Sequence, residues 1–154
     1  MRTRILYRAA AVLLFLFAVG HTLGFRDADP TWRVGPVQAA MRSIHFTIQG
    51  FTRTYWDFFV GAGFTVGVLY LFAAVLAWQL GGLSGETLAR MRATAWGFAC
   101  CFAVATVVSV RHLFWIPIIM SALITVCLTA ATWSSSRFAA SATVPKGTSQ
   151  RSAS

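Results

Sequence analysis

The sequence has few charged side chains for its length. Only 11% of its 154 residues are Asp, Glu, Lys or Arg, whereas soluble domains carry about 25%. Acidic residues are the rarest, with four against thirteen basic ones that are nearly all arginine. Such basic excess would suit a nucleic-acid-binding protein if the other residues were polar, but 57% are hydrophobic. We therefore expect a membrane protein whose partners are membrane lipids, with no nucleic-acid partner.

Cysteine is also scarce, and its positions do not suit covalent or metal chemistry. Cys100, Cys101 and Cys127 all lie within apolar runs, and no CxxC motif is present. A disulfide framework is therefore excluded. We interpret the three cysteines as small packing residues, and we expect no metal site and no bound cofactor.

Four apolar runs are long enough to cross a membrane, which needs about 20 mostly apolar residues in a helix. They lie at about residues 5–25, 55–80, 93–110 and 113–133. The short link between the third and fourth runs predicts a tight helical hairpin. The sequence therefore predicts an all-α fold, an integral membrane bundle of four transmembrane helices formed by residues 1–133.

The first run also has features of a secretory signal peptide. Its basic start and the small residues Ala18 and Gly20 would fit cleavage after Gly20. However, the apolar stretch continues to near-spanning length, and three further runs follow. We therefore expect the first helix to be retained.

The longest polar connection, about residues 26–54, has an internal pattern. Apolar side chains recur there at helical spacing, at Val37, Met41, Ile44, Ile48 and Phe51. Pro36 suits the first turn of a helix, where a missing N–H costs nothing. The pattern predicts one amphipathic interfacial helix at about residues 36–49.

Basic residues in the flanks favour one orientation of the chain. Eight lie on the side of the termini and the second connection, and five lie on the other side. Because cytoplasmic flanks carry the excess of Lys and Arg, we expect both termini in the cytoplasm. Residues 134–154 are rich in Ser, Ala and Thr, which predicts a disordered cytoplasmic tail.

With this orientation, the ionisable side chains near the membrane share the outer end of the helices. This predicted polar layer consists of His21, His45, Arg53, Asp57, Arg111 and His112. A carboxylate in a membrane costs about 2.5 to 3.5 kcal/mol at a helix centre and less near its ends. Asp57 is therefore expected to be charge-paired, with Arg53 or Arg111 as its main partner and with His112 or His21 as alternatives.

The polar layer could serve several functions. Recognition of an anionic lipid head group by Arg53, Arg111 and Arg42 is physically the easiest, because arginine binds phosphate in a bidentate manner. Binding of another membrane protein, or of further copies of this chain, is a related possibility. We expect a small membrane protein that binds a lipid or a protein partner through this layer.

An enzyme or redox subunit is the alternative, acting on a lipophilic substrate of the quinone, sterol-like or haem-linked kind. Acid–base catalysis would use His21 and Asp57 as a pair. Haem ligation would use His21 with His112 or His45, but their spacing is not diagnostic. Whether the protein is an enzyme stays open at this point.

Pairs of small residues predict where helices approach one another closely. Gly20 with Gly24, and Gly63 with Gly67, have the four-residue spacing that lets backbones meet in lipid. We expect these four glycines to lie at helix–helix contacts.

Three motifs, "AVGHTLGF", "RTYWDFFVGAG" and "LAWQLGGL", resemble those of an uncharacterised bacterial family of small four-helix integral membrane proteins. The resemblance covers most of the chain before the tail. It implies a multi-pass protein of the bacterial inner membrane and draws attention to His21, Arg53, Tyr55, Trp56 and Asp57. It implies no activity and no substrate.

Overall fold

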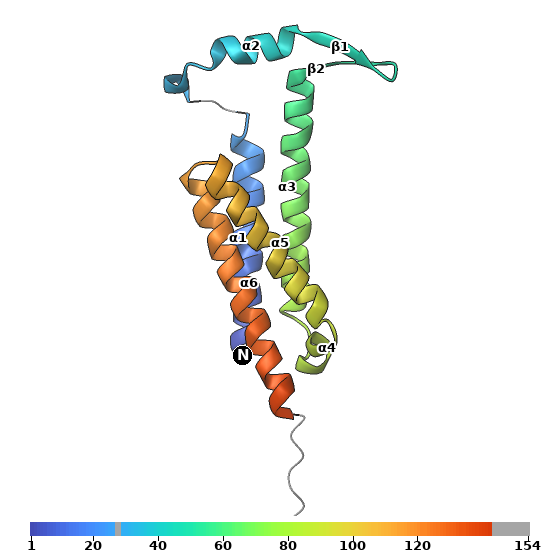
Figure 1. Ribbon diagram of the computed structural model, residues 1–154, viewed down its shortest axis with the longest axis vertical. Coiled ribbons are helices and arrows are strands. Elements are labelled where there is room, and N and C mark those ends of the chain that lie inside the picture. Colours follow the sequence, from blue (N-terminus) through green and yellow to red (C-terminus); the bar gives the residue numbers. More distant parts are fainter. Residues whose placement is uncertain (27–28, 143–154) are drawn as a thin grey trace, which may run out of the picture. The chain divides into compact units, whose positions relative to one another are not determined.

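The protein, in a computed structural model that describes residues 1–26 and 29–142, is helical apart from one small hairpin (Figure 1). Four helices are long and apolar enough to cross a membrane. They are α1 (Arg2–Gly24), α3 (Tyr55–Leu80), α5 (Arg92–His112) and α6 (Trp115–Ala142). The all-α fold and the multi-pass membrane class are thus confirmed.

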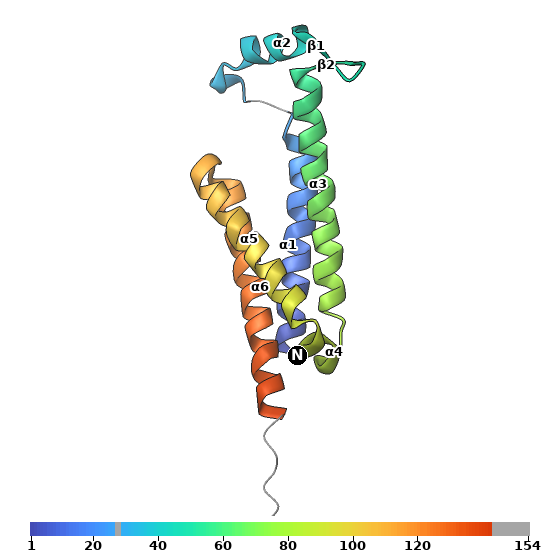
Figure 2. The same cartoon turned by 45° about the vertical axis from the view of Figure 1, so that its right-hand side comes forward.

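The chain divides into two compact units. We call Met1–Ala10 with Ala77–Ser154 the terminal unit, and Ala11–Leu76 the hairpin unit. In the terminal unit, α5 and α6 run side by side in both views (Figures 1 and 2). The hydroxyl oxygens of Thr106 and Thr125 lie 3.0 Å apart and form a hydrogen bond between these helices. Such bonds help to join helices in lipid, where the hydrophobic effect does not.

A second buried hydrogen bond joins the start of α1 to α6. Tyr7 and Thr132 are both fully buried, and their hydroxyl oxygens lie 3.1 Å apart. The Thr132 hydroxyl donates to the Leu128 carbonyl, so the Tyr7 hydroxyl donates to Thr132. Next to Tyr7, the Arg8 guanidinium lies 3.3 Å from the centre of the Trp78 ring, a cation–π contact.

The short helix α4 (Gly85–Arg90) precedes α5 and packs against both α5 and α6. It begins after Ser84, whose side chain accepts a hydrogen bond from the Thr87 N–H. Its exposed Glu86 and Arg90 form a salt bridge of 2.7 Å, one helical turn apart. The sequence pattern had predicted only a connection here.

The prediction of a disordered tail is wrong for residues 134–142, because they continue α6. The three serines at its start do not break the helix, because each hydroxyl donates to a carbonyl of the preceding turn. Alanines, the best helix formers, follow at positions 139 and 140. The remainder of the predicted tail, residues 143–154, lies outside the described residues.

In the hairpin unit, α1 from Ala11 onward lies beside α3 (Figure 2). The Phe17 and Tyr70 rings contact each other with centroids 4.3 Å apart. Gly63 and Gly67 of α3 are buried, and a methyl group on either would overlap the side chain of Phe25 or Thr22, respectively. These two glycines therefore allow the close approach of α1 and α3.

Gly20 and Gly24, predicted to act in the same way, do not contribute to this approach. A Cβ built at either position has no atom within 4 Å among the described residues. The close contact thus has glycines on α3 only, and α1 supplies larger side chains. The four-residue spacing thus correctly predicted a close helix contact for Gly63 and Gly67 of α3 but not for Gly20 and Gly24 of α1.

The predicted amphipathic helix is shorter than expected. Helix α2 covers Gly35–Ser43, and residues that the prediction had assigned to it form the first strand of an antiparallel hairpin, β1 (His45–Ile48) and β2 (Phe51–Thr54). Gln49 and Gly50 both have positive φ, 53° and 83°, as a two-residue type I′ turn requires. Ile44, Phe46 and Ile48 also alternate with period two, so their spacing suits a strand as well as a helix.

A short 3-10 helix, η1 (Pro30–Trp32), precedes α2. The Asp29 carboxylate caps it by accepting hydrogen bonds from the Thr31 hydroxyl and backbone N–H. These two bonds lower the pKa of the Asp29 carboxyl. The connection between the first two spans is therefore built from local capping and turn interactions rather than from one long helix.

The glycines of α3 give a direct test of its contact with α1. Replacing Gly63 or Gly67 with Ala should lower the thermal stability in detergent, because overpacking costs about 1 to 3 kcal/mol. Gly61→Ala is the matched control on the same helix, since a Cβ there has no atom within 4 Å among the described residues. Gly61→Ala should be neutral or slightly stabilising. Equal losses at Gly61 and Gly63 would contradict the contact.

Candidate functional site

The candidate site begins at the first turn of α3, where a reciprocal cap joins the hairpin to the helix. Thr54, the last residue of β2, donates its backbone N–H and its hydroxyl to Oδ2 of Asp57, at 2.8 and 2.9 Å. The Asp57 N–H donates in return to the Thr54 hydroxyl oxygen at 3.1 Å. This is a capping box with Asp in place of the usual Glu or Gln. It also puts a negative charge at the positive end of the helix dipole.

The cap replaces the ion pair that the sequence led us to expect. Among the described residues of the hairpin unit, Asp57 forms no salt bridge, so the predicted direct partnership with Arg53 is wrong. Arg53 lies on β2 rather than on the helix, so the four-residue helical spacing does not apply. Its guanidinium donates to the Thr52 carbonyl at 2.9 Å and acts on Asp57 only through its charge.

Arg111 and His112 lie exposed at the end of α5, in the terminal unit. Their predicted membership of the polar layer, and the pairing of Asp57 with Arg111, stay predictions. Of the other members, His45 and Arg53 lie close enough to Asp57 in the hairpin to act on it through their charge, whereas His21 lies against Gly63 further along α3.

His21 connects α1 to α3 through a backbone carbonyl. Its Nε2 lies 3.1 Å from the Gly63 oxygen, and because a carbonyl can only accept, Nε2 carries the hydrogen. The imidazole stacks between the rings of Phe17 and Phe25, with centroid distances of 5.8 and 5.3 Å. His21 and Asp57 thus have separate hydrogen-bond partners and do not form the acid–base pair considered from the sequence.

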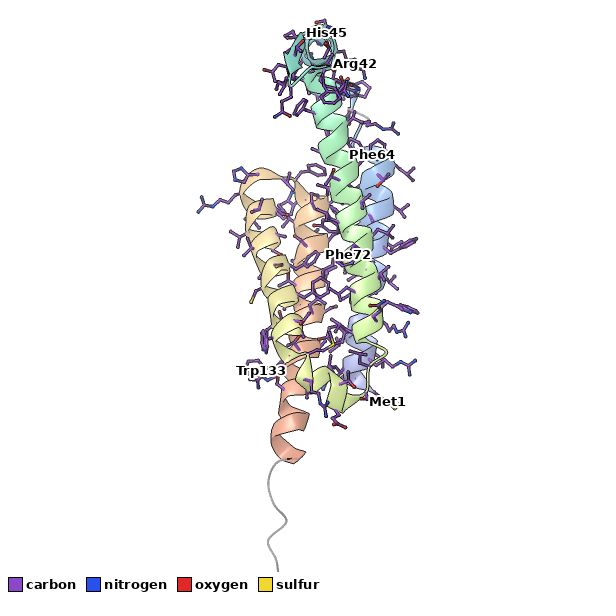
Figure 3. All side chains as sticks on the ribbon, turned by 90° about the vertical axis from the view of Figure 1, so that its right-hand side faces the viewer. Met1, Arg42, His45, Phe64, Phe72 and Trp133 are labelled. Atoms are coloured by element: carbon purple, nitrogen blue, oxygen red, sulfur yellow. The ribbon has the colours of Figure 1, made fainter. Side chains whose placement is uncertain are left out.

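His45 and Arg42 lie at the end of α3 where the hairpin joins it (Figure 3). His45 pairs with Thr54 in the hairpin register, and its Nδ1 donates to the Ser43 carbonyl at 2.9 Å. The Arg42 guanidinium lies 4.1 Å from the centre of the Trp56 ring, a cation–π contact. Arg42 of α2 and His45 of β1 thus lie near the first turn of α3.

A groove of about 590 Å³ lies between the hairpin and the start of α3, within the size range of small-molecule sites. Its lining consists of Ile48, Gln49, Phe51, Arg53, Asp57, Phe58, Gly61 and Ala62. The charged residues lie where the hairpin meets the helix, and Phe58, Gly61 and Ala62 continue along the membrane span. The groove therefore combines two charged side chains with apolar side chains from both the hairpin and the span, as an amphipathic ligand would require.

The groove could hold an organic ligand through Arg53, Asp57 and its apolar wall. A metal ion has no comparable site, because no group of three His, Cys, Asp or Glu side chains suitable for a metal occurs in the part of the chain that is described. Arg53 and Asp57 were predicted from the sequence as site residues, whereas Thr54 was not. The Thr-x-x-Asp pattern over residues 54–57, directly before an apolar run, was the signal that could have revealed the cap.

Removing the Thr54 hydroxyl tests the cap. Thr54→Val keeps the shape of this buried side chain, which is only 8% exposed, but it deprives Asp57 of a donor and of an acceptor. We expect a loss of about 1 kcal/mol in the free energy of unfolding, the usual cost of losing an N-cap. Thr54→Ser, which keeps the hydroxyl, is the control. Unfolding in detergent micelles measures both, and equal stability of the two variants would rule out the cap.

The chain matches no protein-family model, no curated protein and no solved structure.

Proposed function

We propose that the protein binds the phosphate head group of a membrane lipid in the groove between the hairpin and α3. The observation that carries this proposal is the composition of the groove lining, in which Arg53 of β2 and Phe58, Gly61 and Ala62 of the membrane span line one groove. Guanidinium groups bind phosphate strongly through paired N–H donors. The apolar wall suits the chain of a lipid whose head lies at the membrane boundary.

Neighbouring contacts support a position at the membrane–water interface. Arg42 stacks on Trp56, and Arg26 lies 5.4 Å from the centre of the Phe64 ring. Aromatic side chains are enriched where a membrane span meets the head-group layer, and arginines there attract anionic lipids.

The orientation is part of the same proposal. Eight basic residues on the side of the termini against five on the other side favour cytoplasmic termini. The groove then faces the outer side of a bacterial inner membrane. Membership of the small four-helix bacterial family fits this proposal and stays a prediction.

Lipid binding is favoured over the enzymatic or redox alternative by the state of the titratable side chains. In the groove these are Arg53 and Asp57, and the carboxylate is engaged by Thr54. His21 donates to a backbone carbonyl. The hydrogen bonds of Asp57 and His21 thus give both side chains a structural role that requires no reaction.

Phospholipid retained after purification in a mild detergent tests the proposal. Arg53→Gln should lower the bound phospholipid per protein about tenfold, because a hydrogen bond to a charged group contributes about 1.5 to 3 kcal/mol. Arg33→Gln is the matched control, since Arg33 is in the same connection but does not line the groove.

Equal phospholipid retention by the parent and Arg53→Gln would overturn the proposal. Retention of a quinone or a haem chromophore without phospholipid would instead support the redox alternative. A stable complex with another protein or a second copy, insensitive to Arg53→Gln and free of lipid, would point to partner binding through another surface.

A further inference from the structure

The two oxygens of the Asp57 carboxylate differ in their hydrogen bonds. Both donors of Thr54 reach Oδ2, whereas Oδ1 accepts no hydrogen bond from the described residues of the hairpin unit. Asp57 is exposed and lines the groove. The cap therefore fixes the orientation of the carboxylate and leaves one oxygen able to accept a hydrogen bond from a ligand.

The charged lining of the groove thus consists of one cation and one anion. Arg53 donates one of its N–H groups to the Thr52 carbonyl, and a guanidinium has five, so others are available for a phosphate. A purely anionic head group would meet attraction at Arg53 and repulsion at Asp57. A head group with a phosphate and a primary ammonium would match both charges.

We infer that the groove recognises an aminophospholipid, of which phosphatidylethanolamine is the simplest. This inference rests on the proposed function and adds the chemical class of the head group. The phosphate binds Arg53, and the ammonium donates a hydrogen bond to Oδ1 of Asp57. Because Thr54 already holds the carboxylate, little conformational freedom is lost on binding.

The N–H donors of the ligand are the critical feature. A choline head group carries the same charges as ethanolamine, but its quaternary nitrogen has no hydrogen to donate. A carboxylate that loses contact with water without gaining a donor is penalised. The groove should therefore distinguish two lipids of equal net charge.

The test uses the wild-type full chain in detergent, with lipids of identical acyl chains that differ only in the head group. The series is phosphatidylethanolamine, its N-methyl and N,N-dimethyl derivatives, phosphatidylcholine and phosphatidylglycerol. Native mass spectrometry measures the bound fraction of each lipid. We expect the sharpest fall, about tenfold, between the dimethyl derivative and phosphatidylcholine, where the last N–H is lost.

Asp57→Asn provides the matched variant. Its amide oxygen can still accept from Thr54, while an NH2 group replaces the free oxygen, so the cap can persist without the acceptor for ammonium. The preference for ethanolamine over choline should disappear in Asp57→Asn, and Arg53→Gln should weaken all five lipids. Because the head-group series is run on the parent protein, the result does not depend on whether a variant folds.

The outcomes distinguish a failure of the aminophospholipid inference from a failure of the proposed phosphate recognition. Equal binding of the dimethyl derivative and phosphatidylcholine, or tighter binding of phosphatidylglycerol than of phosphatidylethanolamine, overturns the aminophospholipid inference. If Arg53→Gln still weakens the bound lipids in that case, phosphate recognition stands. If the parent binds none of the five lipids better than Arg53→Gln does, both are overturned.

Discussion

The start of α3 must satisfy a strict physical constraint. The first N–H groups of a helix have no acceptor within the helix, so a side chain at the helix start has to supply one. Thr54 provides an acceptor for one of these groups, the Asp57 N–H, and the Asp57 carboxylate in turn accepts from the N–H and the hydroxyl of Thr54. Since Thr54 ends β2 and α3 begins at the next residue, the same bonds hold the hairpin to the helix. The position of Arg53 beside the span, and with it the groove, depends on this junction.

The rest of the molecule is held together by small residues and hydroxyl groups. Gly63 and Gly67 let α1 approach α3, and His21 adds a hydrogen bond to the Gly63 carbonyl. In the terminal unit, the pairs Tyr7 with Thr132 and Thr106 with Thr125 perform the same task. These are the interactions expected where apolar side chains gain little by leaving lipid for the protein interior. They give each unit its own contacts and do not engage Arg53 or Oδ1 of Asp57.

Much of the fold could be predicted from the sequence, because a membrane span depends on the length and polarity of one continuous segment. The second span, predicted at residues 55–80, coincides with α3. The hairpin could not be distinguished from a helix, since Ile44, Ile48 and Phe51 fit helical spacing while alternation and a Gln-Gly turn also fit a strand. The site was predicted only in part. Arg53 and Asp57 were identified by their charge, but their relation was misjudged, because the spacing of four residues implies contact only if both lie on one helix.

The central claim is that capping, not ion pairing, organises the charged residues at the start of α3. Double-mutant cycles in detergent test it most directly, with Thr54→Val and Asp57→Ala in one cycle and Arg53→Gln and Asp57→Ala in the other. Residues that share a hydrogen-bond network couple by about 0.5 to 3 kcal/mol. We predict a coupling in this range between Thr54 and Asp57 and a coupling near zero between Arg53 and Asp57. A larger coupling for Arg53 with Asp57 than for Thr54 with Asp57 would contradict the account.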